Sequence, residues 1–223
     1  MESVATLLAP PFLKVDDNKI EIRYDNKFSD NNLVITKKTM SQNNAYLELI
    51  IGPMFSGKTS KLLDIYKQCN FCSIPCVIIN HSSDTRYHET MLSSHDHVLA
   101  PCIMLSKLED CLAIKEVKDA RVILINEGQF YPDLELSVIT LLNHDKKVYI
   151  CGLDGDFERK KFGQILDLIP MCDKVTKISS LCGICRDSTK AIFSMRLTDE
   201  KDQTIVGTEN YSPVCRKCYS STF

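Results

Sequence analysis

Eight consecutive residues, at positions 52–59, have the types and spacing needed to bind a polyphosphate. The segment Gly-Pro-Met-Phe-Ser-Gly-Lys-Thr fits the P-loop pattern G-x-x-x-x-G-K-[ST]. Its glycines let the backbone wrap tightly, so that successive N–H groups point inward at phosphate oxygens. Lys58 supplies a positive charge for the β- and γ-phosphates, and the Thr59 hydroxyl is a ligand for Mg²⁺. The motif predicts a nucleoside polyphosphate site formed by Gly52, Pro53, Met54, Phe55, Ser56, Gly57, Lys58 and Thr59.

The segments on either side of this loop favour the same interpretation over a glycine-rich turn without a ligand. Tyr46–Ile51 is an apolar run that predicts a strand entering the loop, and residues 60–67 predict a helix leaving it. This order of strand, loop and helix aims the helix N-terminus at a bound anion.

A second group of polar residues follows another predicted strand. Asn126 and Glu127 come at the carboxyl end of the apolar segment 121–125. In an open α/β sheet, this end of the strands forms the ligand crevice. P-loop enzymes commonly place an Asp here that helps to hold Mg²⁺, and this chain has Asn126 in that position. Glu127 is suited to accept a proton from a substrate hydroxyl or to position water, and a solvated carboxylate is the alternative.

Four cysteines near the C-terminus have the spacing of a metal site. Cys182 and Cys185 form one C-x-x-C pair, and Cys215 and Cys218 form another. Two such pairs supply four thiolates that close a tetrahedral Zn²⁺ site and leave no open position for catalysis. We therefore expect structural zinc that pins the base of a long loop, with redox chemistry or unrelated thiols as the alternatives.

A third C-x-x-C pair lies at the end of the helix predicted after the P-loop. It consists of Cys69 and Cys72, with Cys76 close by, and it has no second pair to complete a metal site. Buried core cysteines are the favoured interpretation.

Composition places the chain among ordinary globular proteins. The 223 residues carry a formal net charge of −2, so there is no global basic signature and nucleic acid is not an expected partner. No apolar run has the length of a membrane span, and the N-terminus lacks the pattern of a secretory signal, so no membrane partner is expected. The eleven cysteines then indicate reduced thiols or metal ligands and a cytoplasmic location.

The elements that position these residues alternate along the chain. Apolar runs typical of buried parallel strands alternate with helical stretches, which predicts an α/β fold with a mainly parallel sheet. We expect an N-terminal extension without stable structure at residues 1–44, a P-loop nucleotide-binding domain at 45–170 and a zinc-binding domain at 171–223. The predicted strands cover residues 47–51, 76–80, 98–105, 122–126 and 148–153.

Further short motifs occur in a fixed order between residues 46 and 219. Besides the P-loop and both cysteine pairs, they are Asp84-Thr-Arg-Tyr87, His95-Asp96, Glu127-Gly-Gln-Phe130, Pro132-Asp133, Leu153-Asp-Gly155, Phe157, Arg159-Lys160, Phe162-Gly163 and Tyr211. This ordered series resembles the type II thymidine kinases, the zinc-containing family found in cells and large DNA viruses. The resemblance implies a recombinase-like P-loop core, a small zinc-bearing lasso domain and a homotetramer.

The resemblance also implies a reaction. In it, the γ-phosphoryl group of ATP passes to the 5′-hydroxyl of thymidine or deoxyuridine, in the salvage of pyrimidine deoxynucleotides for DNA synthesis. The triphosphate end product, dTTP, is the implied feedback inhibitor.

Catalytic and cofactor-binding roles follow from the same resemblance. Glu127 is expected to be the general base for the 5′-hydroxyl, and Arg86 to stabilise charge on the moving phosphoryl group. The cofactors are ATP, Mg²⁺ and structural Zn²⁺. The P-loop and Asp84, Asn126 and Gln129 are expected to bind ATP and its metal.

The nucleoside site is implied in the same way. An apolar slot for the base is expected from five side chains, for which ordinary core packing is the alternative, and backbone groups of a later loop are expected to contact the pyrimidine edge beneath Tyr211. The slot residues are Met54, Phe130, Leu153, Phe157 and Phe162, and the loop residues are Thr204, Ile205, Val206 and Gly207.

Two residues depart from the pattern of the family. Asn126 stands where members usually have Asp, which removes a negative charge near the metal. Val206 stands where a second Gly is common, which limits backbone freedom beside the base.

Three functions therefore remain open. The first is an active thymidine kinase, which Lys58, Thr59 and Glu127 favour. The second is a nucleotide-binding homologue with lost or reduced catalysis that acts by binding or assembly, for which Asn126 argues. The third is a P-loop ATPase that acts on nucleic acid, which the acidic charge balance disfavours.

Overall fold

Two units make up the chain, Met1–Asn43 and Asn44–Phe223. The computed structural model describes residues 13–16, 19–22, 45–84, 91–93, 99–200, 202–203 and 209–221. In the first unit, β1 (Leu13–Asp16) and β2 (Lys19–Ile22) pair as an antiparallel hairpin. The expected lack of stable structure in residues 1–44, like the expected boundary between residues 170 and 171, stays a prediction.

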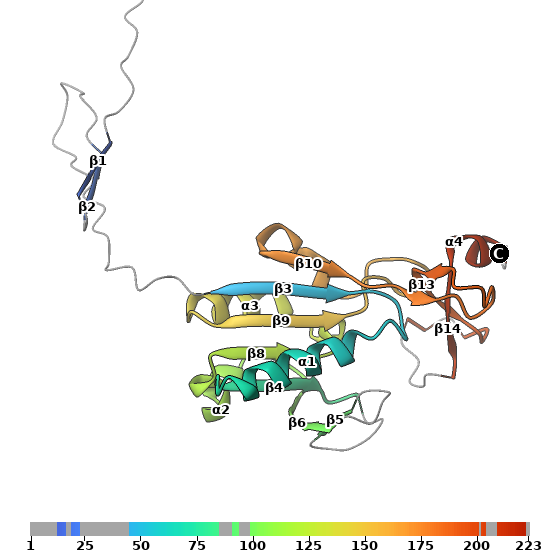
Figure 1. Ribbon diagram of the computed structural model, residues 1–223, viewed down its shortest axis with the longest axis horizontal. Coiled ribbons are helices and arrows are strands. Elements are labelled where there is room, and N and C mark those ends of the chain that lie inside the picture. Colours follow the sequence, from blue (N-terminus) through green and yellow to red (C-terminus); the bar gives the residue numbers. More distant parts are fainter. Residues whose placement is uncertain are drawn as a thin grey trace, which may run out of the picture. The chain divides into compact units, whose positions relative to one another are not determined.

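A six-stranded sheet forms the centre of the second unit (Figure 1). Every neighbouring pair of strands in it is parallel, so the predicted α/β fold with a parallel sheet is confirmed. Across the sheet the order is β10 (Lys174–Lys177), β3 (Tyr46–Ile51), β9 (Lys147–Gly152), β8 (Val122–Ile125), β4 (Cys76–His81) and β7 (Ile103–Leu105).

Both faces of this sheet are buried, because successive residues of a strand point to opposite sides. On β3, Leu47, Leu49 and Ile51 belong to one core cluster, and Ile50 belongs to another. Buried residues of α2 (Lys115–Asp119), α3 (Leu134–Asn143), η1 (Cys111–Ala113) and η3 (Ile165–Met171) pack into the first cluster. The second cluster contains Leu62 and Leu63 of α1 (Lys58–Phe71). Burial on both faces explains why the strands appear as continuous apolar runs.

Two parts of the sheet differ from the prediction. Residues 98–105 do not form one strand: β6 (Leu99–Pro101) pairs antiparallel with β5 (Met91–Ser93), and β7 pairs parallel with β4. Pro101 has no backbone N–H to continue a ladder, so the chain changes partner after it. The edge strand β10 was not predicted, because its sequence Lys-Val-Thr-Lys is largely exposed and has no apolar run.

The C-terminal part of the unit has small antiparallel sheets and its own core. β11 (Ser180–Leu181) pairs with β12 (Lys190–Ala191), and β13 (Phe193–Arg196) pairs with β14 (Tyr211–Val214), ahead of α4 (Arg216–Ser220). In Figure 1, β13, β14 and α4 lie beyond the carboxyl ends of β3 and β9. The described helices include none that is long and apolar enough to cross a membrane.

A core substitution tests the role of the central strand β9. Ile150 is 0% exposed within the first cluster, so Ile150→Ala should lower the free energy of unfolding by about 2–5 kcal/mol through lost burial and a new cavity. Leu136 on α3 is 71% exposed, and Leu136→Ala should change it by about 0.5 kcal/mol or less. Urea denaturation measures both, and equal losses would contradict this assignment of the core.

Candidate active site

The P-loop joins β3 to α1 at the carboxyl edge of the sheet (Figure 1). Gly57 has a φ of 84° directly before α1, in the left-handed region that glycine adopts without a side-chain clash. At Gly52, a Cβ atom would lie 2.2 Å from the carbonyl oxygen of Ile178, so only glycine fits. Lys58 Nζ donates to the Pro53 carbonyl oxygen at 2.7 Å and therefore lies across the loop. The predicted arrangement of strand, loop and helix is present.

A chain of polar side chains leads away from Thr59. Its hydroxyl Oγ1 donates to Asn126 Oδ1 at 3.5 Å, Asn126 Nδ2 donates to Asn80 Oδ1 at 2.8 Å, and Asn80 Nδ2 donates to Asp84 Oδ2 at 3.2 Å. The Cys151 thiol also donates to Asn126 Oδ1, at 2.9 Å. A carboxylate oxygen only accepts hydrogen bonds, so Asp84 sets the orientation of both amides. Asn126 consequently turns its oxygen, rather than its NH₂ group, toward Thr59.

These residues suit a hard divalent cation. Asn126 is 1% exposed, and its oxygen lies beside the Thr59 hydroxyl. Oxygen atoms of this kind bind Mg²⁺ directly or through its water molecules, so the donor set fits Mg²⁺. Asn80 and Cys151 were not predicted from the sequence to belong to this site. Asn80 lies near the carboxyl end of β4, where the rule that identified Asn126 applies equally, but Cys151 gave no comparable indication.

Glu127 has an unusual backbone conformation and an oriented carboxylate. Its φ and ψ are 54° and 44°, at the start of η2 (Gly128–Phe130). Positive φ is uncommon for residues with a side chain and is concentrated at functional sites. Gln129 Nε2 donates to Glu127 Oε2 at 2.7 Å, and Gln129 Oε1 accepts from the Leu153 backbone N–H at 2.9 Å. A buried amide anchored to the end of β9 thus holds the carboxylate, while the predicted contact of Gln129 with the cofactor stays a prediction.

The predicted base-binding side chains fall into separate groups. The rings of Phe130 and Phe162 meet edge to face with centroids 5.5 Å apart, and Phe162 is buried. Phe157 instead packs against Arg196, whose guanidinium carbon lies 3.7 Å from the ring centroid. Met54 is joined to the C-terminal part, because its backbone N–H donates to Ser194 Oγ at 2.9 Å. Leu153 contacts Gln129 through its backbone, as described above.

Some predicted site residues fall outside the part of the chain that the structure describes. These are Arg86 and the loop residues Thr204, Ile205, Val206 and Gly207. Tyr211, which follows the loop, is described, and its hydroxyl oxygen accepts a hydrogen bond from Arg196 Nη2 at 2.6 Å.

The four C-terminal cysteines form a compact cluster. Their sulfur atoms all lie within 4.8 Å of one another, and Cys185 Sγ is 3.7 Å from Cys215 Sγ and 3.3 Å from Cys218 Sγ. Thiolates around a tetrahedral zinc ion are about 3.8 Å apart. Burial raises the pKa of Cys182, but backbone N–H groups, including those of Cys185 and Cys215, outweigh burial and lower it to about 6. The donor set therefore fits structural Zn²⁺.

The Cys69–Cys72 pair has a different environment. Cys69 is buried, Cys72 is exposed and Cys76 is half-buried, and burial raises the pKa of Cys69 and Cys76. Within the described ranges, the cluster around Cys182 is the one group of His, Cys, Asp or Glu side chains placed to hold a metal. Core packing thus accounts for Cys69, as expected, whereas the expectation of a buried core cysteine is wrong for the exposed Cys72.

Comparison with known proteins identifies the family. The family model described as "Thymidine kinase" matches residues 45–219. The chain belongs to the thymidine kinase family. The thymidine kinase of variola virus is 40% identical over 178 residues, which are 79% of this chain and 98% of that protein. Thymidine kinase 1 of Dictyostelium discoideum is 39% identical over 181 residues, which are 78% of each chain. The thymidine kinase of Yaba monkey tumor virus is 38% identical over 181 residues, 81% of this chain and 97% of that one.

The polar chain of this thymidine kinase family member predicts an effect of Asn126→Asp. An Asp cannot donate to Asn80 Oδ1, and Asn80 can donate to the new carboxylate only by giving up its hydrogen bond to Asp84. We expect the free energy of unfolding without Mg²⁺ to fall by about 1–3 kcal/mol. MgATP should restore part of this loss, because a carboxylate strengthens metal binding in the folded state.

Urea denaturation with and without MgATP measures both effects. Asn143→Asp, at an exposed position at the end of α3, is the matched control and should show neither. An Asn126→Asp protein as stable as the unaltered chain without the metal would contradict the fixed orientation of the amides.

Removal of one cysteine ligand tests the metal site. Cys215→Ser should abolish zinc binding, lower the melting temperature and weaken thymidine binding, because zinc held by all four cysteines would fix the base of the loop between the cysteine pairs. Cys172→Ser, outside the cluster, should keep the zinc. Zinc content by mass spectrometry, thermal unfolding and thymidine calorimetry give the three readouts. Normal thymidine affinity in the metal-free protein would refute the link between zinc and the loop.

Proposed function

We propose that this chain transfers the γ-phosphoryl group of ATP to the 5′-hydroxyl of thymidine, with deoxyuridine as a second substrate. The observation that carries the proposal is the oriented carboxylate of Glu127, which directly follows the residue that contacts the P-loop threonine. Membership of the thymidine kinase family and the names of the relatives support the choice of nucleoside.

In the proposed reaction, the 5′-oxygen of thymidine attacks the γ-phosphorus as the bond to the β,γ-bridging oxygen breaks. The hydroxyl proton passes to the Glu127 carboxylate, and ADP leaves with the electron pair of the broken bond. The Gln129 amide keeps the accepting carboxylate in place. Lys58 and the P-loop N–H groups hold the donor phosphates. Arg86 stabilises charge on the phosphoryl group during its transfer. Thr59 and Asn126 would hold Mg²⁺, which would neutralise charge on the phosphates.

The chain of polar side chains from Thr59 to Asp84 also bears on the alternative of a nucleotide-binding homologue with lost or reduced catalysis. That alternative depends on Asn126, which lacks the charge of Asp. Its oxygen is nevertheless turned toward Thr59, which is the direction that metal binding requires. An active kinase is therefore favoured.

Further features of the proposal derive from the family. They are feedback inhibition by dTTP, assembly as a homotetramer and a cytoplasmic location. The proposed nucleoside site comprises Met54, Phe130, Leu153, Phe157, Phe162, Tyr211 and the backbone of residues 204–207.

The substitution Glu127→Gln tests the proposed base. The amide oxygen of the introduced side chain can still accept from Gln129, so the fold is kept while the proton acceptor is lost. We expect kcat for thymidine phosphorylation to fall by about 10²- to 10⁴-fold with little change in thymidine affinity. Formation of labelled thymidine monophosphate by zinc-loaded protein with Mg²⁺ and ATP is the assay.

Glu109→Gln is the matched control, because the side chain of Glu109 is 57% exposed in an ion pair with Lys107. A Glu127→Gln protein with full kcat would remove Glu127 from the role of base. Failure of the folded, zinc-loaded chain to form thymidine monophosphate would overturn the proposed function, and ATP hydrolysis stimulated by nucleic acid would favour the ATPase alternative.

A further inference from the structure

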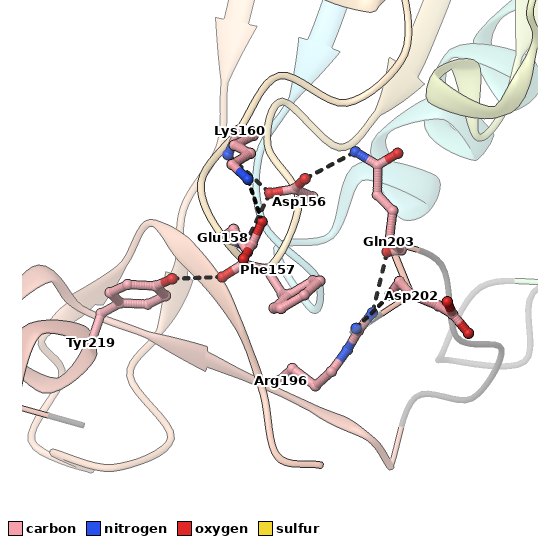
Figure 2. A network of polar contacts seen from close by, with 8 residues as sticks. All are labelled: Asp156, Phe157, Glu158, Lys160, Arg196, Asp202, Gln203 and Tyr219. Atoms are coloured by element: carbon pink, nitrogen blue, oxygen red, sulfur yellow. Dashed lines mark hydrogen bonds and ion pairs between the residues drawn. The ribbon is translucent and has the colours of Figure 1, made fainter. Parts of the chain in front are cut away.

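Arg196, at the end of β13, is the centre of a polar network that the sequence did not indicate (Figure 2). Its Nη1 donates to the carbonyl oxygens of Glu200, at 2.9 Å, and Asp202. Its Nη2 donates to the carbonyl oxygen of Gln203 at 3.2 Å and to the Tyr211 hydroxyl at 2.6 Å. Arg196 thus binds the chain both before and after residues 204–208. These are the residues that include the proposed pyrimidine contacts.

The same guanidinium group also packs on an aromatic ring. Its carbon lies 3.7 Å from the centroid of Phe157, a geometry in which a planar cation stacks on the face of the ring. The backbone of Phe157 is held separately, because the Tyr219 hydroxyl donates to its carbonyl oxygen at 2.7 Å (Figure 2). Tyr219 directly follows Cys218 of the proposed zinc site. The position of Phe157 therefore depends on two contacts. Arg196 packs on its ring, and Tyr219, next to the cysteine cluster, holds its backbone.

A third connection joins the loop to the turn that carries Phe157. Gln203 Nε2 donates to Asp156 Oδ2 at 2.9 Å, while Asp156 Oδ1 accepts from the backbone N–H groups of Glu158 and Lys160, each at 2.9 Å. Asp156 is 6% exposed, so this carboxylate is fixed within the turn. Gln203 is consequently held through its backbone by Arg196 and through its side chain by Asp156 (Figure 2).

We propose that Arg196 is a positioning residue for the nucleoside, which holds the Phe157 ring and the Tyr211 hydroxyl, both in the proposed nucleoside site, in the geometry that thymidine requires. The inference rests on the proposed thymidine site. Arg196 uses its two terminal nitrogens on four partners and also uses its flat face. Lysine has three donors and no planar group, so it cannot reproduce this arrangement. Side chains held in place before binding lose less conformational entropy when the ligand arrives, so releasing them weakens affinity.

If Arg196 positions the nucleoside site, its substitution should change the KM for thymidine and not the KM for ATP. Arg196→Lys should raise the KM for thymidine by about tenfold, the equivalent of losing about one hydrogen bond to a charged group. Gln203→Ala keeps Arg196 and removes only the connection to Asp156, so it should raise this KM by about threefold. Both variants should keep the KM for ATP within about twofold, together with the zinc content. Arg121→Lys, at an exposed position before β8, should change none of these quantities.

Steady-state kinetics with each substrate varied in turn, zinc analysis and thymidine calorimetry on the full chain provide the test. An unchanged thymidine KM in Arg196→Lys and Gln203→Ala would overturn the proposal. So would equal increases in both KM values or loss of zinc, since these indicate a role in stability alone. If Arg196→Lys fails to fold, the Gln203→Ala protein decides. An unaltered chain that binds thymidine but does not phosphorylate it would count against the proposed function, while calorimetry on the variants would still test Arg196.

Discussion

Strand β9 pairs with β3 on one side and with β8 on the other, in a register that places Ile51 opposite Gly152 and Ile125 opposite Ile150. This parallel alignment brings the segments after β3 and β8 to one edge of the sheet, where Thr59 meets Asn126 across the end of β9. A Cβ atom at Gly152 would lie 2.4 Å from Gln129 Oε1, so a side chain there would displace the amide that holds the Glu127 carboxylate. The contact of Thr59 with Asn126, where we propose that Mg²⁺ binds, and the orientation of Glu127 both depend on this one strand.

The C-terminal part that carries the cysteine cluster is connected to the same edge by direct contacts with the P-loop. Ser194 Oγ accepts from the Met54 N–H, and Ser180 Oγ donates to the Phe55 carbonyl oxygen at 3.0 Å. The loop that would bind ATP and the part that carries the proposed nucleoside site therefore support one another. Through these contacts, a metal bound by the four cysteines would affect the P-loop even without an open coordination position.

Much of the architecture was predictable because its determinants are local in sequence. Buried strands such as β8 are continuous apolar runs, and the spacing of the P-loop and of the cysteine pairs is set by backbone geometry. The edge strand β10 lacks such a run, since most of its residues are exposed to solvent. Arg196 could not be identified as a functional residue, because its role depends on carbonyl groups and on a ring brought to it by tertiary folding. Asn80 could have been found, since it occupies the same end of its strand as Asn126.

The order of strands across the sheet also has a consequence for synthesis of the chain. The outer neighbour of β3 is β10, which is the last of the six strands in sequence. At Gly52, which follows β3, the carbonyl group of Ile178 leaves no room for a side chain, and Ile178 directly follows β10. While the protein emerges from the ribosome, one side of β3 therefore keeps unpaired backbone groups until the segment with β10 appears, and such edges favour misassociation. The phosphate-binding loop can therefore reach its final shape only after the segment with β10 and Ile178 has been made.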